Sequence, residues 1–117
     1  MTSDVPQGVT DWTREACRRV VRDLADEGRP VSHVYGFAPW PDHSNRRCVD
    51  LMLPTVDRVH WVRAYLVRHR RALRVRLIIA DRRIWRSYRK GLIPAGTWAP
   101  YLGKSPHRDH VHVEFDA

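Results

Sequence analysis

The C-terminal segment is the part of the sequence that most restricts the fold. Residues 110–114 read His-Val-His-Val-Glu, which is a strict alternation of polar and apolar side chains. Successive side chains of a β-strand point to opposite faces of a sheet. The pattern therefore predicts a strand with both histidines and Glu114 on one face and the valines on the other. The polar face is either solvated or built to hold a ligand, and this segment alone leaves both interpretations open.

Length and composition indicate one folded domain. The chain has 117 residues, of which 43% are hydrophobic and five are tryptophan, enough for a single core but not for two. We expect one domain over residues 1–117, with a helical region at 1–30 and the core at 31–115. Cys17 and Cys48 lack the spacing of a zinc knuckle or a disulfide framework. We expect two buried thiols, and a single disulfide is the alternative.

Charge and the N-terminus bear on partners and location. A net charge of +8 and a pI near 10.5 predict attraction to an anionic partner, and nucleic acid, a membrane surface and an anionic cell-wall polymer all qualify. The first residues have no basic segment followed by an apolar run, and no later run approaches the length of a membrane span. We therefore expect synthesis in the cytoplasm without a signal peptide, and no membrane insertion.

Periodicity and turn residues predict the order of the elements. Thr10 is a candidate N-cap for a helix that Gly28 ends, and Thr55 is a candidate N-cap for a second helix reaching about residue 73. Strands are predicted at 31–37, 48–53 and 75–80, and 83–85 is expected to pair with the last of these across Asp81-Arg82. Residues 86–104 are predicted to form a long loop that brings Trp98 and Tyr101 close to a site.

The candidate chemistry begins with Asp50, a carboxylate inside an apolar strand. Such a group must be paired or bind a cation, because burying it alone costs several kcal/mol. His43 precedes it by seven positions, and His112 can supply a further ligand from the final strand. Two histidines and one carboxylate suit zinc and leave a fourth position for water, as in catalytic sites.

Taken together and in this order, the motifs resemble a known family. His43, six residues and Asp50, followed by Asp109-His110-Val111-His112, resemble the zinc site of the D-Ala-D-Ala carboxypeptidase and Hedgehog-like metallopeptidase superfamily. The likeness is closest to a branch of actinobacterial and phage peptidoglycan peptidases, in which an Arg-Arg-Ile-Trp segment and a Pro-His-x-Asp-His-Val-His-Val ending recur. These are residues 82–85 and 106–113 here, and the likeness spans about residues 31–115.

The resemblance implies an α+β fold with a small, mainly antiparallel sheet and two main helices. It also implies a Zn²⁺ ion held by His43, Asp50 and His112, and hydrolysis of peptide bonds in peptidoglycan stems or cross-links. Asp109 would be the general base, His110 would bind the developing oxyanion or orient Asp109, and His107 would support the ligands from behind.

Asp109 can take this role only on one condition. The regular strand must begin at about His110, after a turn at residues 108–109, because a regular strand through Asp109 would point it away from the histidines. In that second case Glu114 or His110 would be the better candidate for the base.

The sequence also departs from the pattern of the superfamily. Pro41, Arg46 and Cys48 stand where relatives usually carry Ser, Gly and Ala. Many relatives have an arginine in a Gly-aromatic-Arg stretch before the first ligand, where this chain has Ala38. Arg46 or Arg47 is a hypothetical substitute for that arginine, and with Trp98 and Tyr101 these residues are the predicted substrate contacts.

Three functions follow from these features. The leading one is a monomeric zinc peptidase acting on peptidoglycan peptides within an anionic wall, as an endolysin released by a holin-type route or as a virion-associated lysin of a bacteriophage. The second is a zinc-binding but catalytically impaired module that binds the wall or has a structural role, motivated by Ala38 and Arg46. The third is a metal-dependent nuclease or nucleic-acid-binding protein, which the charge and the tryptophans favour and no recognised motif accompanies.

Overall fold

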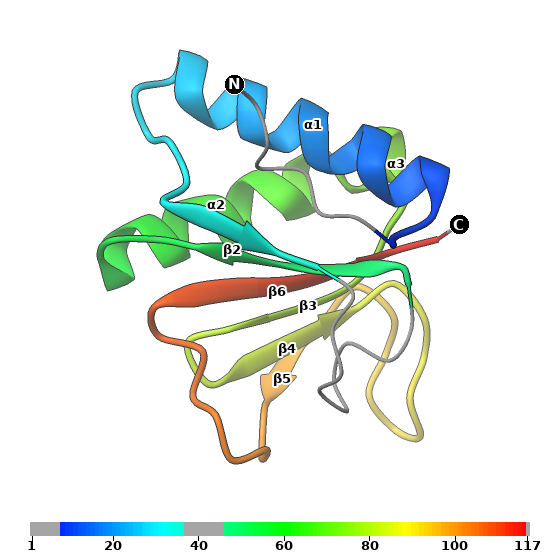
Figure 1. Ribbon diagram of the computed structural model, residues 1–117. Helices are drawn as coiled ribbons and strands as arrows, with labels where there is room; N and C mark the ends of the chain where they lie inside the picture. The colour runs from blue at the N-terminus through cyan, green and yellow to red at the C-terminus, as the bar shows by residue number, and fades with distance from the viewer. Residues whose placement is uncertain (1–7, 37–45, 117) are drawn as a thin grey trace.

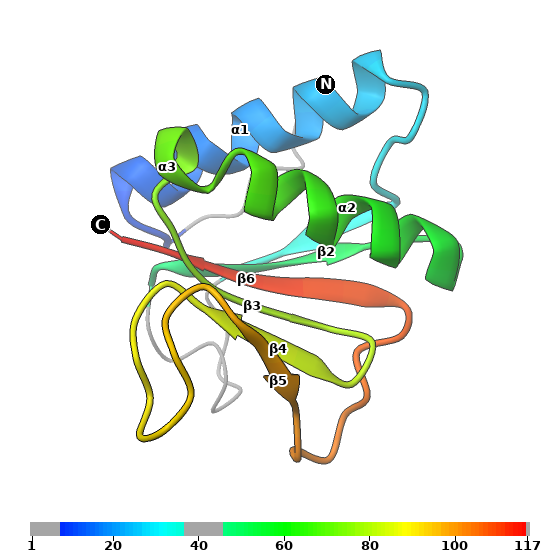
Figure 2. The same cartoon turned by 180° about the vertical axis from the view of Figure 1, so that it is seen from behind.

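One antiparallel sheet with helices on one face makes up the protein. The structure, a computed structural model, describes residues 8–36 and 46–116. The sheet has six strands in the order β1-β2-β6-β3-β4-β5, and Figures 1 and 2 show all three helices on the same side of it. The predicted small α+β domain with two main helices is confirmed. The elements are α1 (Asp11–Asp26), β1 (His33–Tyr35), β2 (Cys48–Met52), α2 (Val56–Arg68), α3 (Arg70–Leu73), β3 (Val75–Ala80), β4 (Arg83–Arg86), β5 (Trp98–Pro100) and β6 (His110–Phe115).

The first helix begins and ends where the sequence predicts. Thr10 is its N-cap and accepts a hydrogen bond from the Thr13 backbone N–H at 3.2 Å. Gly28 follows the last turn with φ of +72°, a conformation that favours glycine. The core thus gains an amphipathic helix, because Cys17, Val20 and other apolar residues of α1 are fully buried against the sheet.

The second predicted helix is interrupted. Thr55 caps α2 as expected, but the helix ends at Arg68, and a separate short helix, α3, follows His69. Arg74 then adopts a left-handed conformation, with φ of 58°, and turns the chain into β3. The interruption and the turn leave Leu73 buried in the core. The burial of Leu73 is a matter of tertiary packing, which the local sequence does not indicate.

The strands require two corrections. The predicted strand at 31–37 is shorter, with regular pairing over His33–Tyr35. The predicted loop at 86–104 contains β5, which pairs with β4 as an edge strand. A three-residue strand ending in proline has too little pattern to be recognised, and proline is tolerated at a sheet edge. The β3–β4 hairpin across Asp81 and Arg82 is confirmed.

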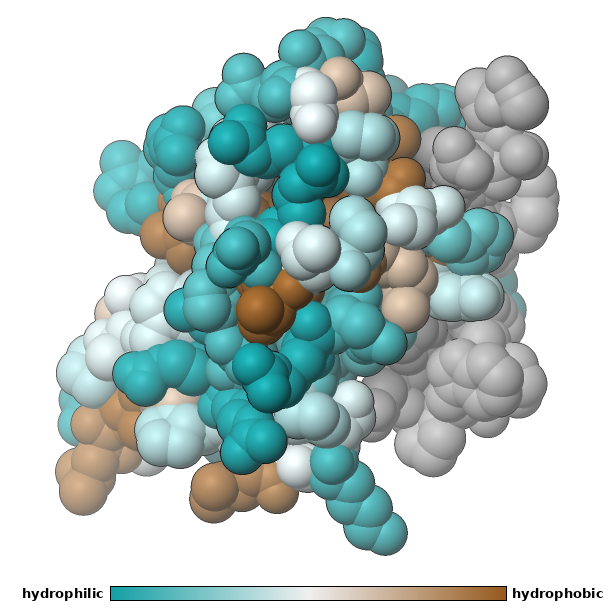
Figure 3. Space-filling view, turned by 90° about the vertical axis from the view of Figure 1, so that its left-hand side faces the viewer, coloured by the Kyte–Doolittle hydropathy of each residue, from teal (hydrophilic) through white to brown (hydrophobic). Residues whose placement is uncertain are grey.

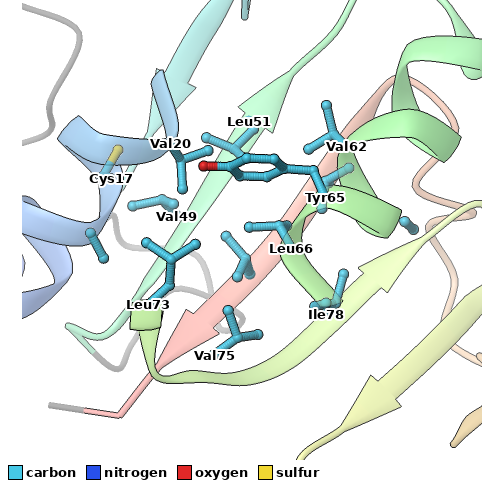
Figure 4. Packing of buried hydrophobic residues seen from close by; sticks show 14 of the residues in the cluster. Cys17, Val20, Val49, Leu51, Val62, Tyr65, Leu66, Leu73, Val75 and Ile78 are labelled. Atoms are coloured by element: carbon cyan, nitrogen blue, oxygen red, sulfur yellow. The ribbon is translucent and has the colours of Figure 1, made fainter. Parts of the chain in front are cut away.

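The sheet has two different faces because its strands pair in register. Val49, Val113, Ile78 and Trp85 pair in turn across β2, β6, β3 and β4, and all four belong to the core beneath the helices. Figure 4 shows this core, in which the Tyr65 ring of α2 lies between helices and sheet. Its hydroxyl donates to Asp23 Oδ2 of α1 at 2.7 Å, which ties the two helices together. Both cysteines are buried thiols, as expected.

The opposite face carries the polar side chains. A second row of directly paired residues crosses all six strands on this face: Tyr35, Asp50, His112, Ile79, Ile84 and Ala99. The last three form a small hydrophobic cluster of their own. The side of the molecule in Figure 3 is mostly hydrophilic with scattered hydrophobic residues.

Over residues 8–36 and 46–116, no helix is both long enough and apolar enough to cross a membrane.

Candidate metal centre

Asp50 and His112 form the centre of the polar face. They are direct partners in the β2–β6 register, so their side chains leave the sheet on the same side. The Oδ1 atom of Asp50 lies 3.0 Å from Nδ1 of His112, and the imidazole side chain is only 4% exposed. The two predicted ligands that the structure describes are therefore in contact and largely shielded from water.

Further ionisable side chains extend this pair into an alternating chain of carboxylates and imidazoles. Nε2 of His112 lies 3.4 Å from Glu114 Oε2, and Nε2 of His110 lies 3.9 Å from Asp50 Oδ2. On its other side, Nδ1 of His110 lies 2.7 Å from Asp109 Oδ1. We call these five residues the His–carboxylate chain: Asp109, His110, Asp50, His112 and Glu114. Each of its two imidazoles lies between two carboxylates. His110, His112 and Glu114 can join the same chain because they share one face of β6.

The pairing alters the pKa of two members. Burial of the His112 ring lowers its pKa, but the hydrogen bonds with Asp50 and Glu114 outweigh burial and raise the pKa to about 9. The hydrogen bond from His110 lowers the pKa of Asp109, so that carboxyl group is ionised at neutral pH.

His107 supports the histidines from one side. Its ring centroid lies 4.5 Å from that of His110 and 6.2 Å from that of His112. Burial lowers the pKa of His107, and its Nδ1 is 2.9 Å from the Ser105 carbonyl oxygen. Tyr101 packs edge-on against it, with a centroid distance of 5.2 Å. His107 and Tyr101 thus lie beside the histidines of β6, and their proposed roles stay predictions.

Gly103 makes room for the Tyr101 ring. A Cβ atom added at Gly103 would lie 2.1 Å from the Tyr101 hydroxyl oxygen, which no side chain could tolerate without moving the ring. The absence of a side chain at this position therefore lets Tyr101 fold back toward His107.

The approach to β6 has the irregular backbone that the role of Asp109 requires. Regular pairing begins at His110, and His107 has a positive φ of 54°. The β3–β4 turn holds this segment, because the backbone N–H groups of Asp81 and Arg82 donate to the carbonyls of His107 and Pro106 at 2.7 and 2.8 Å. Asp109 is thereby free of the strand alternation and reaches His110, although its side chain remains 77% exposed.

A charged cluster that sequence reasoning missed reinforces the same turn. Asp81 Oδ2 contacts Nε2 of His60 on α2, and Asp81 Oδ1 lies 3.2 Å from Nε of Arg108. The hydrogen bond from His60 is the main reason that the pKa of Asp81 is lowered. No sequence signal links residues 60, 81 and 108, which meet only because α2 crosses the end of the β3–β4 hairpin.

The structure separates the other predicted site residues from the centre. Trp98 lies on the helix-covered side, where it packs against the main core and the Arg63 guanidinium stands 5.1 Å over its ring. Strand alternation explains this position. Trp98 pairs with Trp85, which faces the helices, whereas the next residue, Ala99, faces the polar side. Arg46 and Arg47 are exposed just before β2, and their carbonyls accept from Thr10 and Phe115. His43 and Ala38 lie outside the described residues.

The side chains at this centre include donors that suit the implied zinc ion. A carboxylate oxygen and an imidazole nitrogen, side by side and shielded from water, are the donors that zinc prefers. Within residues 8–36 and 46–116, no group of three or more His, Cys, Asp or Glu side chains is arranged to hold a metal. Because His43 lies outside those ranges, the described residues supply two of the three predicted ligands, and those two fit the group.

Fold and site together define a small α+β protein with a six-stranded antiparallel sheet and a shielded histidine–carboxylate centre on the face opposite its helices. The family described as VldE, C-terminal domain, matches residues 5–112, and the chain belongs to that family. The match covers almost the whole chain, including Asp50, His110 and His112. Neither the curated proteins nor the solved structures contain a match to this chain.

Proposed function

We propose that this protein is a zinc-dependent hydrolase that cleaves peptide bonds of peptidoglycan stem peptides or cross-links, with the metal bound by His43, Asp50 and His112. The observation that carries the proposal is the contact of Asp50 with His112 at 3.0 Å on a shielded sheet face. A carboxylate oxygen and an imidazole nitrogen held together on a shielded face are donors of the kind that zinc binds. The likeness of the surrounding motifs to the D-Ala-D-Ala carboxypeptidase and Hedgehog-like superfamily supplies the substrate class.

The side chains have separate roles in the proposed reaction. The zinc ion, when bound, would supply Lewis-acid chemistry that polarises the scissile carbonyl and acidifies the attacking water. Asp109 is ionised and exposed, so it can accept a proton from that water and pass it to the leaving amine. His110 lies 2.7 Å from Asp109 and holds its carboxylate in place. His107 packs against both histidines of β6 and fixes their rings.

Glu114 is the competing candidate for the base. It lies 3.4 Å from His112, so it stands directly beside a proposed ligand, whereas Asp109 is linked to Asp50 only through His110. We favour Asp109, because the irregular backbone before β6 leaves it free to face a substrate. Glu114, with an 18% exposed side chain, suits a role in orienting His112 through the second ring nitrogen.

The net charge of +8 suits an anionic cell wall as the surroundings of the substrate. On this proposal the protein acts at the wall after release from the cytoplasm by a phage lysis route, or as part of a virion.

The test combines metal analysis with cell-wall zymograms. We expect about one zinc per chain and clearing of wall material, with clearing lost in His112→Ala and Asp109→Ala. Zinc binding without clearing on any wall type would instead identify a catalytically impaired module, the alternative that Arg46 motivates. DNA binding or cleavage that is salt-sensitive and survives His43→Ala would overturn the peptidase proposal in favour of a nucleic-acid function.

A further inference from the structure

A second candidate site lies on the helix side of the sheet, across from the His–carboxylate chain. It is a groove of about 520 Å³ lined by residues of α3 and of the loop that joins β4 to β5. Arg70, Arg71 and Arg74 line one wall, and Trp85, Gly96 and Asp116 are among the residues lining the rest. We call this the basic groove. Its volume falls within the range typical of small-molecule sites.

The arginines are concentrated by the local backbone. All three lie within residues 70–74, and the left-handed conformation of Arg74, with φ of 58°, ends α3 at this point. Among the described residues, no carboxylate forms a salt bridge with Arg70, Arg71 or Arg74. Within residues 8–36 and 46–116, three positive charges therefore line one groove without a salt bridge to a carboxylate, and such like charges repel one another in the absence of an anion.

Two of the guanidinium groups are held in position by the protein. The Arg74 guanidinium lies 4.3 Å from the centroid of the Trp12 ring, and Trp12 is itself fixed by donation from Nε1 to the Leu73 carbonyl at 3.0 Å. Arg70 donates from Nη1 to the Val67 carbonyl at 2.9 Å. Stacking on an aromatic ring leaves the in-plane N–H groups of a guanidinium available to an anion. The groove is thus partly organised before any ligand arrives.

The remaining walls restrict the shape of a ligand. Trp85 is almost completely buried in the core and forms the floor of the groove. Gly96, with φ of +73°, lines the groove, and its backbone N–H donates to the Arg86 carbonyl at 2.8 Å and closes the loop. Asp116 is the single carboxylate among the lining residues, and it lies 3.8 Å from Nη1 of Arg76. Its negative charge would repel the next phosphate of an extended polyanion.

We propose that the basic groove binds the phosphate group of a small phosphorylated ligand. Guanidinium groups bind phosphate oxygens in bidentate pairs, and a phosphate dianion offers several such faces to three arginines, whereas a carboxylate offers one. The basic groove shares no residue with the His–carboxylate chain, and its Trp85 floor belongs to the core on the other face of the sheet.

The experiment measures binding of glycerol 3-phosphate and inorganic pyrophosphate to the full chain by calorimetry. Succinate is the carboxylate probe, and a DNA duplex is the polyanion probe. The groove variant is Arg71→Gln with Arg74→Gln. The matched control is Arg18→Gln with Arg68→Gln, which removes the same charge from two exposed arginines on α1 and α2. Circular dichroism checks the fold, and Arg71→Gln alone, at an exposed position, replaces the double variant if that fails to fold.

We expect both phosphate probes to bind wild type and the control alike, and the groove variant to bind them about tenfold or more weakly. Succinate should bind markedly more weakly than either phosphate probe. The proposal is overturned if neither phosphate probe binds at about 1 mM, or if groove and control variants lose affinity equally, which would indicate non-specific attraction to net charge. It is also overturned if succinate binds with the same affinity as the phosphate probes. A third contrary result would be that the protein prefers the DNA duplex to the phosphate probes and that the groove variant keeps this preference unchanged.

Discussion

Asp50 of β2 and His112 of β6 are direct cross-strand partners whose side chains meet at 3.0 Å on the face opposite the helices. Sixty-one residues separate them in the chain, so the contact is a product of strand register. A slip of either strand by one position would send one of the two side chains into the helix-covered core. The site and the core are therefore fixed by the same pairing.

Removal of His112 should abolish high-affinity zinc binding. We expect His112→Ala and Asp50→Asn to bind zinc more than about a hundredfold more weakly than wild type, because each removes one of three proposed ligands. The measurement is calorimetric titration of metal-free protein, with zinc content determined by elemental analysis. His33→Ala is the control, since His33 is an exposed histidine on the neighbouring edge strand. Stoichiometric, tight zinc binding by His112→Ala would show that the metal is bound elsewhere.

Asp109 and Glu114 can be distinguished as the base by a pair of conservative variants. Asp109→Asn should lower turnover of wall peptides by about 10²–10⁴-fold while zinc binding stays normal. Glu114→Gln should change turnover less and instead weaken zinc binding, because Glu114 touches Nε2 of His112. Turnover and zinc content are measured on the same preparations. If Glu114→Gln proved the more damaging for turnover at full zinc occupancy, the two roles would be exchanged.

Arg82→Gly should stabilise the protein. Asp81 and Arg82 both have positive φ, of 46° and 66°, as a two-residue type I′ turn requires, and glycine adopts this conformation without the strain of a side chain. We expect a gain of about 0.5–1 kcal/mol in the free energy of unfolding, less than the full strain because glycine is more flexible when unfolded. Urea denaturation provides the measurement. Arg83→Gly, one residue later in β4, should destabilise instead, and a loss in both variants would contradict the strain argument.

Asp81 should make the free energy of unfolding depend on pH in the acid range. Its folded-state pKa is lowered from the ordinary value of 3.8, first by the hydrogen bond from His60 and further by the charge of Arg108. A lowered pKa means that the stabilisation is present above about pH 4 and is lost as the pH falls through the folded-state value. Asp81→Asn should therefore cost about 1–2 kcal/mol at pH 7.

The same variant should flatten the acid limb of the stability curve. Thermal unfolding of wild type and Asp81→Asn between pH 7 and pH 2 should show the two curves converging at the acid end. Parallel curves over that range would mean that Asp81 does not carry this dependence.

Much of the secondary structure can be predicted from the sequence, because the residues that determine it are close together in the chain. Thr10 and Thr55 cap helices through their own side chains, Gly28 ends one by its tolerance of positive φ, and the His-Val-His-Val-Glu alternation fixes a face for each side chain of β6. The break at His69 and the strand at Trp98–Pro100 were missed, because packing of Leu73 and pairing with β4 decide them.

The sequence by itself determined that His110, His112 and Glu114 would share one polar face and that Asp50 needed a partner, since strand period and the cost of a buried charge are local properties. Tertiary structure alone decided that the partner is His112, through the β2–β6 register. It also decided that Trp98 faces the helices and not the site, and that Asp81 joins His60 and Arg108 beneath the approach to β6. Such contacts link residues far apart in the chain, and no local pattern encodes them.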